Sequence, residues 1–315
     1  MRRLPVVVGI SLALASVAAV AGTVPDWSWL VPMAGPPPAN KPDDHTARHL
    51  AGSARSFTDT QLHDLKHVVD WFPAEHPAMP SIVSTGHDNA SACGFCHLPT
   101  GHGRPENSAL AGLQAAYIKR QIAAFATGSR RAAWPNALPT KSMSETAKAA
   151  TAGDADQAAL YFSKLRYVSH VTVVEAAELG FRPGRFVYVL QARPKRPIGE
   201  RIIEVPLDSA GFEQRDPHMR YTAYVPPGSL AAGKALAASG GPAGQPCAMC
   251  HGAGLRGGSA PPLAGRSPTM IMRQLVAFKS GARANAEAAP MRRVSAALDD
   301  KMMIALAAYS ATLTP

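Results

Sequence analysis

The cysteines of this chain occur only within two copies of one short motif, C-x-x-C-H. The copies are Cys-Gly-Phe-Cys-His at 93–97 and Cys-Ala-Met-Cys-His at 247–251, and the 315 residues contain no other cysteine. C-x-x-C-H is the attachment motif of c-type haem. Two thiols at this spacing add to the two vinyl groups along one porphyrin edge, and the following histidine reaches the iron. The pattern therefore predicts two covalently bound haems c, held by Cys93, Cys96 and His97 and by Cys247, Cys250 and His251.

Other uses of paired cysteines account for less of this pattern. A disulfide framework in an exported protein leaves the two histidines unexplained. A four-cysteine zinc site needs its C-x-x-C pairs roughly 15–20 residues apart, whereas Cys93 and Cys247 are 154 residues apart. A thioredoxin-type redox site needs a single C-x-x-C within a βαβ unit.

The N-terminus has the three parts of a secretory signal peptide. Arg2 and Arg3 precede an apolar run from Val6 to Val20, which ends in the small residues Ala19 to Ala21. We therefore expect residues 1–21 to be a signal peptide and the protein to be periplasmic, where haem c is attached. An uncleaved anchor stays open as the alternative, because the apolar run approaches the length of a membrane span.

Charge and composition bear on the partners of the chain. The formal net charge is +10 at pH 7, but no run of Lys or Arg is longer than two residues. Scattered basic residues argue against a nucleic-acid partner and favour docking on an acidic protein surface. Aromatic residues make up only 6% of the chain, which is little for two packed cores unless each haem supplies apolar area.

Aligning the two motifs reveals an internal repeat. A Leu-Ala-Gly segment follows each motif, at 110–112 and at 263–265. The apolar residues at spacing i, i+4, i+7 after it predict an amphipathic helix in each copy. The apolar positions are Ile118, Ile122 and Phe125 in the first copy and Ile271, Leu275 and Phe278 in the second. The polar positions that repeat are Gln121 with Gln274 and Arg130 with Arg283.

The repeat also selects the second axial ligand of each iron. Met143 lies 18 residues before Tyr161, and Met291 lies 18 residues before Tyr309. A thioether from a loop methionine opposite the histidine raises the haem potential, so we predict Met143 and Met291 as iron ligands. Each copy is expected to close with a helix, capped by Asp154 in the first copy and by Asp299 or Asp300 in the second.

With these motifs in place, both copies resemble class I cytochrome c domains of the cytochrome c4 and c553 type. The shared pattern is C-x-x-C-H, Pro-x-Leu-Ala-Gly, Gln-Leu-x-x-Phe, Ser-Gly-x-Arg, Met, and a final Tyr-x-x-x-Leu, and it covers about half of the chain. In that family the carbonyl before Leu-Ala-Gly holds the Nδ1–H of the ligand histidine. The resemblance therefore implies a haem-site role for Pro261, whereas the first copy has Ser108 at this position.

The rest of the chain predicts an extension and an insert. Residues 22–56 are proline-rich and expected to be an extended, partly mobile linker, and 58–70 could form one helix with Leu62, Leu65 and Val69 on one face. The loop after it, with His76 and Met79, either covers a haem edge or supplies an exchangeable ligand. Between the copies, short β-branched and aromatic runs predict three to five strands, at 171–174, 186–190, 201–205 and 221–225.

The expected fold is thus mainly α, with two class I cytochrome c domains joined by a small β-rich insert. The predicted division is signal peptide 1–21, N-terminal extension 22–88, cytochrome domain 1 at 89–166, β-rich insert 167–238 and cytochrome domain 2 at 239–315. The insert resembles that of a subgroup of exported dihaem cytochromes, through Gly-Glu-Arg-Ile-Ile-Glu-Val-Pro at 199–206 and Tyr-Val-Pro-Pro-Gly-Ser at 224–229. It either spaces the two haems or docks a partner.

The function expected from these features is single-electron transfer through two six-coordinate haems, which leave no open iron site for a substrate. The partners are expected to be redox proteins, namely a dehydrogenase, an oxidase or another cytochrome. A soluble carrier and the cytochrome subunit of a larger complex both fit. The rival class is an enzyme, a dihaem cytochrome c peroxidase, which needs one haem that is open or held by a releasable histidine.

Overall fold

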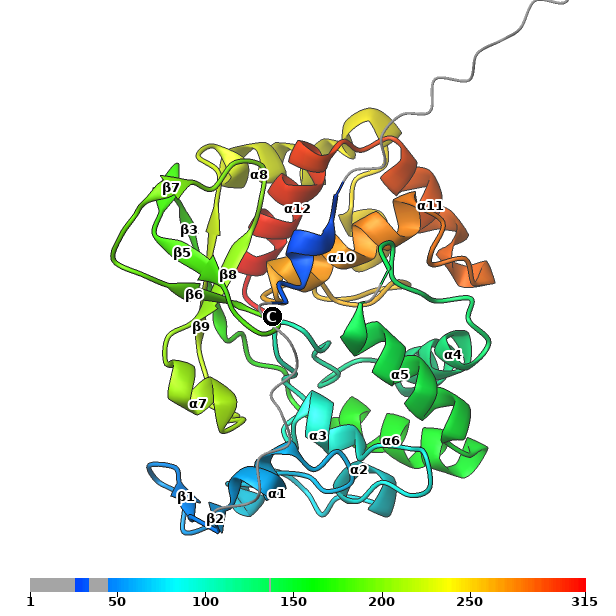
Figure 1. The fold of residues 1–315 in the computed structure, drawn as a ribbon. Helices are drawn as coiled ribbons and strands as arrows, with labels where there is room; N and C mark the ends of the chain where they lie inside the picture. Colours follow the sequence, from blue (N-terminus) through cyan, green and yellow to red (C-terminus); the bar gives the residue numbers. More distant parts are fainter. Residues whose placement is uncertain (1–25, 34–44, 136) are drawn as a thin grey trace, which may run out of the picture.

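The computed structural model describes residues 26–33, 45–135 and 137–315, so the expected signal peptide at 1–21 lies outside the described residues. Helices dominate both ends of the described chain, and most strands lie between them, at 171–225 (Figure 1). Within the described part, no helix has the length and apolar character to cross a membrane. The mainly α architecture expected from the sequence is confirmed.

The first helical region contains the first C-x-x-C-H motif. Its helices are α1 (Asp59–His63), α2 (Ser81–Ser84), α3 (Cys93–His97), α4 (Ala115–Ala126), α5 (Leu138–Ala149) and α6 (Ala152–Lys164), preceded by the hairpin strands β1 (Arg48–His49) and β2 (Ser56–Phe57). Ile118 of α4 and Phe162 of α6 are buried in one core with Ile82 and Val83 of α2.

The second helical region repeats this order around the second motif. Its helices are α8 (Ser229–Ser239), α9 (Ala248–His251), α10 (Pro268–Lys279), α11 (Ala289–Ala296) and α12 (Asp300–Thr312). The predicted apolar face of α10 is buried at all three positions, whereas in α4 only Ile118 is fully buried. Helix α8 crosses α12 closely at Gly233, where a Cβ atom would lie 2.0 Å from the Ala305 carbonyl oxygen.

Short strands occupy the middle of the chain. They are β3 (Val171–Glu175), β4 (Glu178–Leu179), β5 (Phe181–Pro183), β6 (Tyr188–Leu190), β7 (Arg196–Pro197), β8 (Ile203–Pro206) and β9 (Tyr221–Val225), with helix α7 (Ser209–Glu213) between β8 and β9. The largest sheet has the order β3-β9-β8, with β3 parallel and β8 antiparallel to β9. Ala223 and Val225 share a core with Met272 and Ile304, so this sheet packs on helices of the second region.

Two helix starts show how local polar groups position the closing helices. The Asp299 carboxylate accepts a hydrogen bond from Met302 N at 2.8 Å and caps α12, as predicted. The prediction of Asp154 as the cap of α6 is wrong, because Thr151 is the capping residue and Asp154 lies three residues further on. The Thr151 hydroxyl accepts from Asp154 N at 3.1 Å, and the Asp154 carboxylate accepts from Thr151 N at 2.8 Å, which makes a capping box.

One expectation for the N-terminal extension is also wrong. The helix expected over 58–70 ends at His63, because the Asp64 carboxylate accepts from Lys66 N at 2.8 Å and turns the chain. Leu62 and Val69 are buried, but Leu65 is exposed.

Part of the expected linker packs against the second helical region. Trp27 and Leu30 are buried in the core formed by α10 and α12, and Trp27 Nε1 donates to Asp300 Oδ2 at 3.0 Å. The segment that carries them lies beside α10 and α12 (Figure 1). Two large apolar side chains gain more free energy from burial than an extended linker loses in freedom. Residues 34–44, with most of the prolines, lie outside the described residues.

Candidate haem sites

Each C-x-x-C-H motif forms a short helix, α3 in the first copy and α9 in the second. A helix brings the two cysteines of the motif to one side, since residues three apart are neighbours on its surface. All four cysteines are free thiols. Among the described residues, no group of three or more His, Cys, Asp or Glu side chains is placed to hold a metal ion. The four-cysteine zinc site considered from the sequence is therefore not formed.

The two motif histidines are held in the same way. Nδ1 of His97 donates to the Ser108 carbonyl at 2.8 Å, and Nδ1 of His251 donates to the Pro261 carbonyl at 2.7 Å. The serine at the position of the family proline therefore makes the same contact through its backbone. A hydrogen bond at Nδ1 fixes the ring orientation and directs the lone pair of Nε2 outward.

The second nitrogen of His251 tests whether this site fits an iron porphyrin. Nε2 of His251 is buried and has no hydrogen-bond partner, which is costly for a polar atom unless a ligand engages it. Burial lowers the pKa of His97 and also of His251, against the opposing effect of their carbonyl partners. Both imidazoles are thus neutral, the form that ligates a metal, and the donor set fits haem c.

Burial also acts on the motif thiols. It raises the pKa of Cys93 to about 12 and raises the pKa of Cys247 as well. For Cys96, burial raises the pKa although Arg215 nearby opposes the shift. These three thiols are therefore protonated at neutral pH, and each keeps the S–H bond that adds across a vinyl group.

The predicted methionine ligands lie in helices and not in loops, which corrects the sequence expectation. Met143 is in α5 and Met291 in α11, and both helices start close to a proline, which favours the first helical turn. Met291 packs, partly buried, against the same core as Cys247. Met143 is partly buried in α5, which contacts α4. Iron ligation by Met143 and Met291 stays a prediction.

The polar residues of the repeat meet one another between the two copies. Arg130 donates to Gln121 Oε1 at 3.0 Å within its own copy and to Gln274 Oε1 at 2.8 Å in the other. Arg283 mirrors it, donating to Gln274 Oε1 at 3.0 Å and to Gln121 Oε1 at 2.7 Å. Arg283 also reaches the Tyr117 hydroxyl at 2.9 Å. Sequence comparison of the copies found these positions without showing that they bind each other.

Backbone and aromatic contacts follow the same symmetry. Arg131 N donates to the Ala282 carbonyl at 2.8 Å, and Ala284 N donates to the Ser129 carbonyl at 2.7 Å. Each arginine lies over the phenylalanine of its own copy, with 4.5 Å from the guanidinium carbon to the ring centroid in both cases. Burial, followed by repulsion from Arg283, lowers the pKa of Arg130 to about 9.

A second set of contacts ties the carbonyl that holds His97 to the other copy. Ser108 donates its hydroxyl to Met270 Sδ of α10 at 3.2 Å. Arg266 donates to the carbonyls of Ala109 and Ala111 at 2.8 and 3.1 Å, so it binds the backbone at the Leu-Ala-Gly segment of the first copy. Arg266 is 9% exposed. Its role could not be read from the sequence, because it lies outside the repeated positions.

The strands and α7 contact both helical regions through residues that the sequence did not single out. The Glu204 carboxylate of β8 accepts from the Ser267 hydroxyl at 2.7 Å and from Thr269 N at 3.3 Å, at the start of α10. Arg215, just after α7, donates to the Phe95 carbonyl of the first motif at 3.0 Å. Glu204 belongs to the Ile-Ile-Glu-Val-Pro element noted in the sequence, which was the one available signal.

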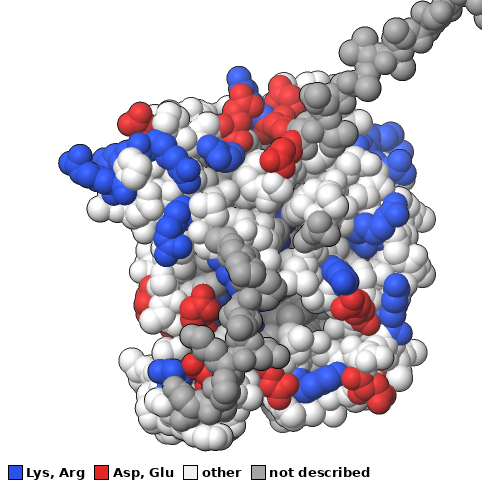
Figure 2. All heavy atoms as spheres, in the orientation of Figure 1, with Lys and Arg blue, Asp and Glu red and all other residues white. Residues whose placement is uncertain are grey.

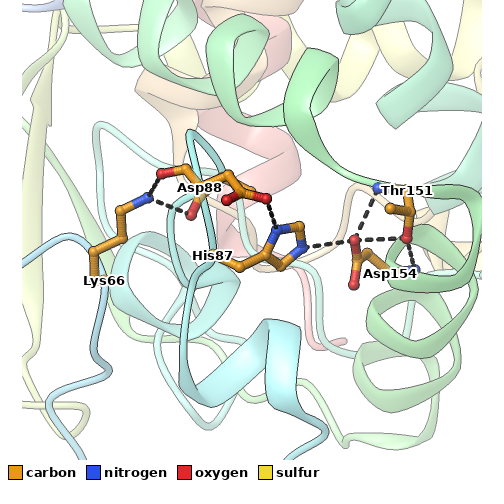
Figure 3. Close-up of polar contacts among 6 residues, drawn as sticks. Lys66, His87, Asp88, Thr151 and Asp154 are labelled. Carbon is orange, nitrogen blue, oxygen red and sulfur yellow. Dashed lines mark hydrogen bonds and ion pairs between the residues drawn. The ribbon is translucent and has the colours of Figure 1, made fainter.

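The loop before the first motif is tied to the closing helix of that copy. Nε2 of His87 binds Asp154 Oδ2 at 2.8 Å, and this is the carboxylate that also serves the Thr151 capping box (Figure 3). Lys66 donates to the carbonyls of Asp88 and Ala90. The hydrogen bond to Asp154, and then that to Asp88, raises the pKa of His87. These contacts fix the entry to α3.

The alternative ligands considered in the extension have other roles or contacts. His76 uses both ring nitrogens, with Nε2 on Asp70 Oδ1 at 3.1 Å and Nδ1 on the Pro77 carbonyl at 2.9 Å. Outside the extension, His102 of the first copy accepts from Val168 N at 3.3 Å and lies against His170, with ring centroids 4.3 Å apart. Met79 is partly buried against the core that also contacts Cys93.

Figure 2 shows one face of the molecule. On this face the largest group of Lys and Arg side chains lies at the upper left, and the others lie in small groups among uncharged and acidic residues.

No protein-family model and no curated protein matches the chain. A solved structure of thiosulfate dehydrogenase (TsdBA) from Marichromatium purpuratum shares 28% identity at a TM-score of 0.46 and is matched over 71% of this chain and 36% of that one. The chain thus spans little more than a third of that enzyme.

Two further similar structures are cytochromes c4, the group that the sequence motifs resemble. The protein from Pseudomonas stutzeri has 22% identity, a TM-score of 0.46 and coverage of 70% of this chain and 93% of that one. The protein from Acidithiobacillus ferrooxidans has 21% identity, a TM-score of 0.45 and coverage of 70% and 98%, respectively.

Proposed function

We propose that this chain is an exported dihaem c-type cytochrome that transfers single electrons. The observation that supports this most directly is the matched pair of histidines, each held at Nδ1 by a backbone carbonyl, with Nε2 of His251 buried and unpaired. In this proposal Met143 and Met291 complete the two ligand sets. Haem c, when bound, supplies an iron that takes up and releases one electron.

The protein's own residues then have three tasks. The Ser108 and Pro261 carbonyls hold the imidazoles in the tautomer that presents Nε2, and this contact increases the basicity of the ligand. Burial keeps both rings neutral. The thiols of each motif anchor the group covalently, so that it stays in place through repeated changes of charge.

The contacts between the copies support a relay between two sites. Arg130 and Arg283 each bind the glutamine of both copies, and Arg266 fixes the proximal segment of the first copy against the second. A fixed separation and orientation of two redox centres is what a relay needs, because electron tunnelling falls steeply with distance. We therefore assign residues 89–166 and 239–315 as the two cytochrome domains.

The test is the haem content and spectrum of the exported protein. Pyridine haemochrome and iron analysis should give two haems c per chain, and both should be low-spin when oxidised. Cys93→Ser with Cys96→Ser should lose one haem, and the matched pair Cys247→Ser with Cys250→Ser should lose the other. A protein without covalent haem would overturn the proposal. A high-spin haem that reacts with peroxide after half reduction would instead favour the peroxidase.

The partners proposed are redox proteins of the periplasm: a dehydrogenase, an oxidase or another cytochrome. A free carrier and a complex subunit can be distinguished by how they are extracted from the cell envelope. Mild osmotic release followed by size-exclusion chromatography should recover a carrier as a single chain, whereas a subunit should elute with its complex. Recovery only with membranes after detergent treatment would point to a subunit or a retained anchor.

A further inference from the structure

The two motifs differ in exposure at equivalent positions. The residues between the cysteines are Gly94 and Phe95 in α3, and Ala248 and Met249 in α9. Phe95 is 3% exposed and Gly94 is also buried, whereas Met249 is 71% exposed and Ala248 is exposed as well. Both cysteines of a motif bond to the same porphyrin edge, so the residues between them mark where that edge meets the surface.

Part of the extension lies directly on the first motif. A Cβ atom at Gly94 would be 2.8 Å from the Val83 carbonyl oxygen and 2.9 Å from Val68 Cγ2. These distances are shorter than any relaxed contact, so only glycine fits beneath Val68 and Val83. The backbone of α2 and the segment before it therefore sit against α3 with no room for solvent.

The insert closes the other side of the first motif. The Arg215 guanidinium carbon lies 3.5 Å from the centroid of the Phe95 ring. Arg215 also donates to the Phe95 carbonyl at 3.0 Å and to the Leu62 carbonyl at 2.9 Å. One side chain of the insert thus joins the motif to the extension. We call Leu62, Val68, Val83 and Arg215 the cover.

The second motif has an open and positively charged setting. The chain from 217 to 286, which contains all of α8, α9 and α10, has no Asp or Glu and seven Lys or Arg residues, of which Arg266, Arg273 and Arg283 are buried. Lys234 of α8 and Arg256, just beyond α9, are exposed. An exposed apolar side chain with only cations along its own segment suits a partner with an acidic face.

We propose that the surface around Ala248 and Met249 is the docking surface for an acidic one-electron redox protein, and that the covered first motif is not. In each exchange one electron leaves the reduced partner of the pair and enters the oxidised one, and no covalent bond forms or breaks. The first site is then reached only through the second. This inference rests on the proposed function and adds which of the two sites exchanges electrons with the partner.

The first test uses charge at the two motifs of the intact haem-loaded protein. The fully reduced protein is mixed with hexacyanoferrate(III), a trianion that accepts one electron, at low ionic strength. Met249→Glu should lower the bimolecular rate constant about tenfold and Met249→Lys should raise it, as expected for electrostatic steering. Glu213→Lys, a charge change on exposed α7 beside the cover, should alter the rate less than about twofold.

The second test measures the cover without electron transfer. Hydroxyl-radical footprinting of the whole protein should show Met249 labelled as fast as in the unfolded chain, whereas Phe95 is strongly protected. Arg215→Ala should increase labelling of Phe95 and leave Met249 unchanged. Equal protection at the two motifs, or a rate that follows Glu213→Lys and ignores Met249→Glu, would overturn the inference. Absence of haem in the purified protein would instead overturn the proposed function, since footprinting needs no haem.

Discussion

At the scale of single residues, the two ring nitrogens of each motif histidine have different roles, and these roles determine what the sites can bind. Nδ1 is committed to a carbonyl, from Ser108 in one site and from Pro261 in the other. Only Nε2 is left for a ligand, and burial keeps the ring neutral. The side chain at the acceptor position is therefore of little consequence, which explains how serine replaces proline there.

The methionines complete this picture and can be tested one at a time. Met143→Ala and Met291→Ala should each leave two covalent haems but convert one of them to high spin and lower its potential, because the thioether no longer stabilises reduced iron. Electron paramagnetic resonance and a potentiometric titration would measure both effects. Met249→Ala is the matched control and should keep both haems low-spin. If the Met143 and Met291 variants kept the native spectra, these ligand assignments would be wrong.

At the scale of elements, polar pairs and close packing hold the segments around the sites. His76 and Asp70 bind each other with little exposure of either side chain. The hydrogen bond that His76 donates to Asp70 raises the pKa of His76, although burial opposes it. The stabilisation from this pair is therefore complete below the ordinary histidine pKa of 6.5 and is lost as the pH rises through the raised value.

This pair predicts a pH dependence of stability. The free energy of unfolding of the native protein should fall by roughly 1 kcal/mol as the pH rises above neutrality, allowing for solvent screening. His76→Gln should reduce that slope and leave the part that comes from His87, whose pKa is also raised, whereas His49→Gln, at an exposed site, should retain the native slope. Denaturant unfolding at a series of pH values measures the slope. A His76→Gln protein with the native slope would contradict the assignment.

The crossing of α8 and α12 gives a second test at this scale. Gly233→Ala should cost about 1–3 kcal/mol of unfolding free energy, because the added methyl group meets the Ala305 carbonyl. Gly153→Ala is the matched control in α6, where the new atom has 3.7 Å to its nearest neighbour. That variant should gain about 0.5–1 kcal/mol from helix propensity. Equal effects in thermal or denaturant unfolding would refute the close approach of α8 to α12.

At the scale of the whole molecule, the repeat makes its own interface. Each arginine binds the glutamine of its own copy and that of the other copy, so that four side chains form one closed network. Buried hydrogen bonds of this kind favour one relative orientation of the copies over all others. A carrier that relays electrons internally benefits from this rigidity.

A double-mutant cycle measures the network. Arg130→Ala and Arg283→Ala should each cost about 1.5–3 kcal/mol, the range for hydrogen bonds from a charged donor. The double variant should cost less than the sum, because both arginines share the same two acceptors. Arg182→Ala, at an exposed position of β5, should be nearly neutral. Additive losses in denaturant unfolding would show that the two arginines act independently.

Several parts of this structure could be predicted from the sequence because they depend on local spacing. The C-x-x-C-H helices, the amphipathic helices α4 and α10, the Asp299 cap and the strands near 171 and 221 all follow from periodicity and residue type. The cap of α6 is not Asp154 but Thr151, three residues earlier, which offers the same hydrogen-bonding chemistry. The helix after Thr58 is shorter than its sequence pattern predicts, because the turn at Asp64 interrupts an otherwise helical pattern.

What depends on distant segments could be decided only by the tertiary structure. The sequence alone determines the two C-x-x-C-H motifs with their histidines and the repeated Gln and Arg positions. The chemistry of each motif depends on a few neighbouring side chains, so it can be recognised from their order in the chain. The facing of Arg130 and Arg283 and the placing of Arg215 on Phe95 join segments more than a hundred residues apart. Such contacts arise from how the helices and the insert pack. The free energy of packing depends on the total apolar surface that each element buries, and this cannot be read from the spacing of residues within one element. For the same reason, two motifs nearly identical in sequence differ in exposure, one covered and one open.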